Sequence, residues 1–134
     1  MTPTGGGDAD TFDLRSTYLH IADGPPVTPV AVGHDFWSDI PAIFDDGRMV
    51  GIFGATDDWP TWERHPDGDE VVVLLSGAAT FVLEEPGGER HIRVRAGDCV
   101  VVPRNVWHRA LVHEPYEAVH ITRGAGTENR AHEP

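Results

Sequence analysis

The sequence lacks the features of secreted, membrane-spanning or disulfide-bonded proteins. It has a single cysteine, Cys99, so no intramolecular disulfide can form. Cys99 opens the apolar run 99–102, where we expect it to pack as a small hydrophobic residue. No apolar stretch approaches the roughly 20 residues that cross a bilayer, and no basic region followed by an apolar core begins the chain. The expected compartment is therefore cytoplasmic.

Basic residues are also scarce. The 134 residues include 10 Lys or Arg against 22 Asp or Glu, which gives a formal net charge of −12. This balance argues against recognition of nucleic acid or of an anionic membrane surface by general electrostatics. Much of the acidity falls in turns, where it favours solubility. The sequence also lacks a Ser-His-Asp triad, a phosphate-binding loop and a zinc-finger cysteine pattern.

No helix of ordinary length and no internal repeat is indicated. Short apolar or alternating segments are instead separated by Gly- and Pro-containing turns, which is typical of an all-β sandwich or barrel. The expected strands are 17–21, 30–32, 48–55, 71–75, 78–83, 91–95, 100–102, 106–112 and 118–122.

The length suits one domain, which we place at residues 11–123. Residues 1–10 are rich in Gly and Asp with nothing to bury, so we expect them to be disordered. Residues 124–134 form a polar tail. Pro115-Tyr116 is interpreted as a turn between the last two strands.

One stretch, residues 62–77, combines ligand-type side chains with turn chemistry. Glu63 and His65 are two apart on an expected strand, so both side chains leave the same face. The residues Pro-Asp-Gly-Asp at 66–69 favour a turn. Glu70 then begins the apolar strand 71–75, and Gly77 closes the stretch. Two strands joined by a short turn therefore direct three ligand-type side chains to one place.

A second stretch, residues 97–108, consists of a Gly turn, an apolar strand, a Pro-containing turn and His108. Together the two stretches resemble the paired motifs of the cupin family, over roughly residues 45–123. His65, Glu70, Gly77, Gly97, Pro103 and His108 match the motifs. Glu63 replaces the first histidine, which alters a metal-ligand position. Asn105 replaces a glycine, a milder change because Asn tolerates a left-handed turn.

A carboxylate–imidazole set suits a divalent metal, and Glu63, His65, Glu70 and His108 are its candidate ligands. Two carboxylates and two imidazoles favour Mn²⁺ or Fe²⁺, with Zn²⁺ and Ni²⁺ as alternatives. The resemblance implies the same chemistry, since cupins bind Fe, Mn, Ni, Zn or Cu. It also implies a double-stranded β-helix, or jelly-roll barrel, with the ligand site inside, and a homodimer formed by sheet packing. The opposing interpretation is that the motif persists as fold architecture without metal.

Further residues are assigned from the strand pattern. We expect Phe81 and His120 to line the pocket, with His120 as the catalytic candidate, although a core role for this histidine is equally compatible with the sequence. By alternation, Trp62 and Trp107 lie opposite Glu63 and His108, as packing or interface residues. Aromatic surface also predicts a homodimer, through Phe36, Trp37, Trp62 and Trp107. Phe36, Trp37 and Ile40 are expected to cover a barrel mouth or a partner by plain packing.

The function that follows is a cupin metalloenzyme acting on a small organic molecule. Dioxygenase, isomerase or cyclase, lyase and hydrolase chemistry all occur on this fold, and the fold does not decide among them. The alternatives are a non-catalytic cupin that binds small molecules or senses metal, and a purely structural dimer.

Overall fold

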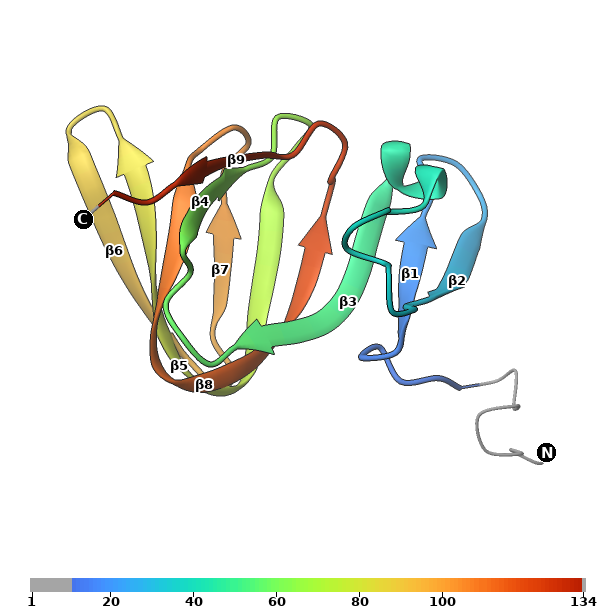
Figure 1. Ribbon diagram of the computed structural model, residues 1–134, viewed down its shortest axis with the longest axis horizontal. Helices are drawn as coiled ribbons and strands as arrows, with labels where there is room; N and C mark the ends of the chain where they lie inside the picture. Colours follow the sequence, from blue (N-terminus) through green and yellow to red (C-terminus); the bar gives the residue numbers. More distant parts are fainter. Residues whose placement is uncertain (1–10, 134) are drawn as a thin grey trace.

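Nine antiparallel strands in the described part of the chain, residues 11–133, form one hydrogen-bonded sheet that rolls into a barrel (Figure 1). The coordinates are those of a computed structural model. One short 3-10 helix, η2 (Ala42–Asp45), is present in these residues. The strands are β1 (Thr17–Ile21), β2 (Val27–Ala31), β3 (Arg48–Ala55), β4 (Thr61–Arg64), β5 (Glu70–Glu85), β6 (Gly88–Arg95), β7 (Cys99–Val102), β8 (His108–Thr122) and β9 (Glu128–Ala131). This confirms the all-β jelly-roll prediction. Within residues 11–133, no helix has the length and apolar character needed to cross a membrane.

Two long strands, β5 and β8, form the central pair of the barrel. Their register runs from Val71 opposite Ile121 to Leu83 opposite His108. β5 also pairs with β6 and β7, while β8 also pairs with β3 and β4. Only β1, β2 and β9 among the described strands pair with neither of the two. In Figure 1 both strands curve through the base of the barrel.

The predicted strands were too short at the centre of this pair. The sequence analysis divided β5 at Gly77 and divided β8 at Pro115-Tyr116, but both strands continue through these positions. Gly77 has a φ of +82°, and the pairing shifts register on both sides of it. The Gly and Pro signals therefore mark an irregularity that bends paired strands, which is a known role of such residues in barrels.

Two edge strands also differ from the prediction. β2 begins at Val27, before the expected strand 30–32; Pro29 is tolerated because β2 is an edge strand. β9 lies in the predicted polar tail and pairs with β4, where Glu128 bonds Arg64 at 2.5 Å. Polar, exposed residues gave β9 no hydrophobic pattern to detect. The prediction for residues 1–10 lies outside the described residues.

The core fills the barrel between its strands. It includes Val72, Leu74, Phe81 and Leu83, each at most 1% exposed. A second cluster packs Tyr18 and Phe36 with Phe44 of η2 beside β3. Cys99 is exposed, contrary to the prediction, because Val100 and Val102 take the inward positions of β7. Ile92 and Val94 face inward on β6.

We expect Gly77→Ala to destabilise the protein by roughly 2–4 kcal/mol, because a non-glycine residue is strained at positive φ. The new Cβ would also overlap the carbonyl oxygen of Pro115 on β8. Gly87→Ala is the matched control, since no atom lies within 4 Å of its added Cβ. Urea unfolding of both variants measures the effect. Equal loss of stability in the two variants would show that the bend does not require glycine.

Candidate metal centre

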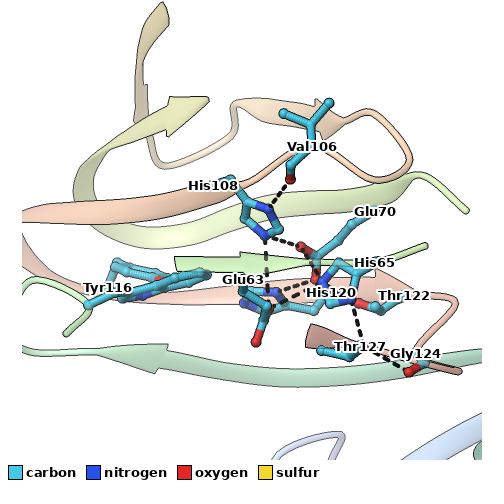
Figure 2. Close-up of polar contacts among 11 residues, drawn as sticks. Glu63, His65, Glu70, Val106, His108, Tyr116, His120, Thr122, Gly124 and Thr127 are labelled. Atoms are coloured by element: carbon cyan, nitrogen blue, oxygen red, sulfur yellow. Dashed lines mark hydrogen bonds and ion pairs between the residues drawn. The ribbon is translucent and has the colours of Figure 1, made fainter. Parts of the chain in front are cut away.

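Four ligand-type side chains converge at one end of the barrel (Figure 2). Glu63 comes from β4 and lies directly opposite His108, the first residue of β8. His65 follows β4, and Glu70 begins β5 after the predicted turn at 66–69. One donor atom from each of the four lies within 4.8 Å of the other three. The structure thus brings together all four predicted ligands.

The turns of the two motifs bond to each other and hold this geometry. The amide of Asn105 donates to the carbonyl of His65 at 3.0 Å, and the amide of Arg104 donates to Asp69 at 2.7 Å. Asn105 has a φ of +66°, so it adopts the left-handed conformation for which the sequence analysis considered it suitable. Arg64 points away from the site toward Glu128.

Distances between the donor atoms suit a shared ion. His65 Nε2 lies 3.2 Å from Glu63 Oε1 and 3.4 Å from Glu70 Oε1. His108 Nε2 lies 3.3 Å from the same oxygen of Glu70 and 3.9 Å from Glu63 Oε1. Two ligands bound at right angles to one ion, each at ~2.1 Å, would lie roughly 3 Å apart. The cluster is therefore close to the size that a single metal ion requires.

Both imidazoles are oriented by hydrogen bonds on the far side of the ring. His108 Nδ1 donates to the carbonyl of Val106 at 3.0 Å. His65 Nδ1 contacts the Thr127 hydroxyl at 2.8 Å, and that hydroxyl donates its hydrogen to the Gly124 carbonyl. Nδ1 of each ring must therefore be the protonated nitrogen, so the neutral ring offers an Nε2 lone pair to the centre. Such outer partners are typical of histidines that bind metal.

Glu70 is the most buried acidic group of the site, at 3% exposure. Its Oε2 accepts a hydrogen bond from Thr122 at 2.7 Å and contacts His120 Nδ1 at 3.4 Å. The His120 ring stacks on Phe53 with 4.0 Å between ring centroids. One oxygen of Glu70 is thus held by the barrel, while Oε1 remains directed at the two ligand histidines.

Three of the converging donor atoms are buried without a hydrogen-bond partner: His65 Nε2, Glu70 Oε1 and His108 Nε2. A buried polar atom left unpaired costs about 1–3 kcal/mol, and native proteins hold few of them. Three such atoms around one point, from neutral imidazole and carboxylate groups, form the donor set that a divalent metal binds. The residues present therefore fit a metal.

The charges of the metal-free site are coupled. Burial alone would lower the pKa of His65, but the carboxylates of Glu63 and Glu70 outweigh burial and raise that pKa to about 9. Burial alone would raise the pKa of Glu70, but the three surrounding imidazoles hold it well below its usual range. At neutral pH, a proton therefore occupies the His65 nitrogen that a metal would need.

A cavity of about 550 Å³ opens beside the four residues. Glu63, His65 and Glu70 line it, together with His120 as predicted. Further lining side chains that the sequence analysis did not assign to the pocket are Met49, Phe53, Trp59, Tyr116 and Thr127. Their positions depend on how strands distant in the sequence pair, so no local motif identified them.

Other predicted residues lie elsewhere. Phe81, predicted to line the pocket, is fully buried in the core. It contacts Trp59, and Trp59 lines the cavity. Trp62 and Trp107 lie outside the cavity, as alternation predicted, and the Arg130 guanidinium covers both rings. Trp37 and Ile40 line the cavity, which is compatible with the expectation that they cover a barrel mouth. Phe36 is buried in packing, as expected.

The fold and site define a double-stranded β-helix barrel with a metal-competent pocket. Residues 54–122, just over half of the chain, match the family model described as a cupin domain. The chain belongs to the cupin family. No curated protein matches the sequence.

Solved structures agree with this fold. A Klebsiella pneumoniae protein with a double-stranded β-helix domain is 21% identical at a TM-score of 0.53; the match covers 63% of this chain and 76% of that one. Oxalate decarboxylase from Bacillus subtilis, described with Mn(II) centres, is 19% identical at a TM-score of 0.52. That match covers 63% of this chain and only 23% of the decarboxylase. At these identities the similarity shows the fold alone.

The raised pKa of His65 predicts how stability of the metal-free protein changes with pH. A folded-state pKa of about 9, above the ~6.5 of an unfolded imidazole, adds stability that is fully present below pH ~6.5. That contribution is lost as the pH rises through 9. We expect the free energy of unfolding, measured with urea after metal removal, to fall by a few kcal/mol across this range.

Glu63→Gln should reduce that fall, because it removes one of the two carboxylates that raise the pKa of His65. Glu128→Gln is the control, since Glu128 is an acidic residue that pairs with Arg64 outside the site. Stability that stays flat between pH 6.5 and 9 in the parent protein would contradict the raised pKa.

Proposed function

We propose that the protein is a mononuclear metalloenzyme acting on a small organic molecule, with Glu63, His65, Glu70 and His108 as the metal ligands. One observation carries the proposal: three buried donor atoms without partners point at one place beside a 550 Å³ cavity. A buried, unpaired donor cluster is costly as fold architecture alone, which argues against the interpretation that no metal binds.

The donor set supports Mn²⁺ or Fe²⁺, with Zn²⁺ and Ni²⁺ as alternatives, because two carboxylates make the set fairly hard. When bound, the metal would supply a Lewis acid for an oxygen donor of the substrate, or a redox partner for O₂. Glu63 is 31% exposed at its side chain and lines the cavity, so a metal held by the four residues would be accessible to a substrate from the cavity.

The chain's own residues would bind the substrate, exclude water and handle protons. Phe53, Trp59 and Tyr116 form an apolar wall that displaces water from the site. His120 is the candidate proton acceptor: Nδ1 faces Glu70, and Nε2 is buried without a partner. Its stacking on Phe53 fixes the ring in place. The proposal leaves dioxygenase, isomerase or cyclase, lyase and hydrolase chemistry open, because the fold does not decide among them.

A second candidate is a non-catalytic cupin that binds a small molecule or senses metal. It is favoured by the ion pairing of the metal-free cluster, in which each ligand histidine finds a carboxylate oxygen within 3.4 Å. These contacts become ion pairs when a histidine is protonated, and a site stabilised in that way can gain and lose the ion without unfolding, which is what a sensor requires.

Metal content and turnover test the function together. Protein purified without chelating resin should hold close to one divalent metal per chain by elemental analysis. Glu70→Ala and His108→Ala should each lower occupancy at least tenfold, because each removes a buried ligand. His91→Ala is the control, since His91 is exposed on β6. Occupancy that survives both ligand changes would contradict the site.

Turnover of a metabolite panel, assayed under air and under argon, then separates the candidates. Metal-dependent product formation indicates an enzyme, and its loss under argon indicates an oxygenase. Metal binding without any turnover across the panel would favour the sensor.

We also propose a homodimer, but through a different surface from the one the aromatic residues indicated. Phe36 and Trp62 are only 4% and 5% exposed, so they are not free to form an interface. The outer face of β5, β7 and β8 is apolar instead, and its side chains lie opposite the buried ones on each strand. This face carries Val71, Val73, Leu75, Val101, Val119 and Ile121. Leu75 and Val101 are 43% and 51% exposed, which favours burial against a second copy.

Light scattering at micromolar concentration should give twice the chain mass of 14.6 kDa. Val101→Glu should shift the protein to monomer, since a charge in the centre of an apolar interface is costly. Ile43→Glu is the control, because Ile43 is an exposed apolar residue on η2, away from this face. A parent protein of monomer mass would exclude the dimer.

A further inference from the structure

The cavity beside the metal centre is lined by acids, and His65 and His120 are the basic side chains among its described lining residues. Asp45, Glu63 and Glu70 line it, and the chain as a whole contains no lysine. The arginines near the site in sequence are engaged elsewhere. Arg109 donates to the Trp59 carbonyl at 2.9 Å, and Arg123 pairs with Asp23 and Asp67. An anion entering this cavity would find no arginine or lysine to replace its lost hydration, and the His65 imidazole already faces the carboxylates of Glu63 and Glu70.

A bound metal would not reverse this charge. The sum is +2 from the ion and −1 from each of Glu63 and Glu70, which is zero, and Asp45 at the mouth then leaves the cavity at −1. Cupin motifs with histidine in place of Glu63 would give a centre one unit more positive. The Glu63 departure therefore removes the one positive field that could attract a carboxylate.

The cavity walls are largely aromatic. Trp37, Phe53, Trp59 and Tyr116 line it, with 5.2 Å between the ring centroids of Trp37 and Phe53. Aromatic faces carry negative charge density, so they favour apolar groups and cations over anions. The aromatic walls and the acidic side chains therefore both disfavour an anionic ligand.

Tyr116 adds a hydrogen-bond donor to this wall. Its hydroxyl accepts a hydrogen bond from Trp59 Nε1 at 3.1 Å, which leaves its own hydrogen available. Burial raises the pKa of Tyr116 to about 12, so the hydroxyl stays neutral in ordinary buffers. A ligand can thus present an oxygen acceptor to Tyr116 without carrying a charge.

We propose that this cavity takes an uncharged or cationic molecule with an apolar, ring-sized body and a neutral oxygen donor, and that it discriminates against carboxylates. The inference deepens the proposed function by naming its substrate class, and rests on that function for the ligand's contact with metal. The charge argument also applies to the metal-free cavity, so the substrate-class inference and the proposed metalloenzyme function can be tested separately.

Three probes of matched shape test the class: 2-(1-naphthyl)ethanol, 2-(1-naphthyl)ethylamine and 1-naphthylacetate. They share one ring system and differ in the charge of a short side arm. Dissociation constants would be measured by NMR titration of the full chain loaded with Zn²⁺, and again after metal removal. We expect the alcohol and the amine to bind at least ~tenfold tighter than the acetate in the loaded protein.

Asp45→Asn isolates the charge at the mouth without changing a metal ligand. The preference for amine over acetate should narrow by about two- to threefold, which is the effect of one solvent-screened charge near the ligand, and the zinc content should not change. Asp35→Asn is the matched control, because Asp35 is an exposed aspartate that does not line the cavity. An equal effect of both variants would mean that net charge, not the cavity, sets the preference.

The outcomes separate this inference from the proposed function. Loaded protein that binds the acetate as tightly as the alcohol overturns the substrate class and leaves the metal site standing. Protein that takes no zinc overturns the metalloenzyme, yet the order of amine over acetate in the empty cavity still supports the charge argument. Failure of both alcohol and amine to bind either form overturns the inference.

Discussion

Burial of the Glu70 carboxylate is the constraint on which the rest of the site depends. A carboxylate at 3% exposure is stable only where hydrogen bonds or charges replace water. Thr122 and His120 supply one side of Glu70 from β8, while His65 and His108 supply the other. Each of these partners is held by the pairing of β5 with β8 or by the turns of the two motifs. The barrel and the cluster around Glu70 therefore stabilise each other, and a substitution in one affects the stability of the other.

The pairing of β5 with β8 also separates the side chains of the cavity from those of the outer surface. Along β5 and β8, inward residues build the core or the site, and outward residues form the apolar face. The positive charges of the chain lie on other surfaces, in pairs such as Arg64 with Glu128 and Arg123 with Asp23. An acidic, aromatic cavity inside an acidic protein is the result.

Much of the site was predictable because its ligands lie in local patterns. Glu63, His65 and Glu70 are separated by a turn that Pro, Asp and Gly specify, and His108 follows a Pro-containing turn after a short apolar strand. The residues that form the cavity walls were harder to predict from the sequence. Trp59 and Tyr116 are 57 residues apart and meet only through strand pairing. Phe81 was predicted to line the cavity where Trp59 does, because alternation along a strand shows which side chains face inward but not how deep in the barrel they lie. β9 escaped prediction because backbone pairing with β4, not hydrophobic burial, defines it.

The register of β5 with β8 also sets an order of assembly. Glu63, His65 and Glu70 lie within eight consecutive residues and can come together as soon as the turn at 66–69 forms, because local contacts close fast. His108 joins them only after a loop of some forty residues has closed and the long strands have paired, which is the slow event in a β-rich topology. A metal ion present during folding could therefore meet a three-ligand nucleus first. The last ligand would then arrive with barrel closure, so that the ligand set of the ion would be completed only when the fold is complete.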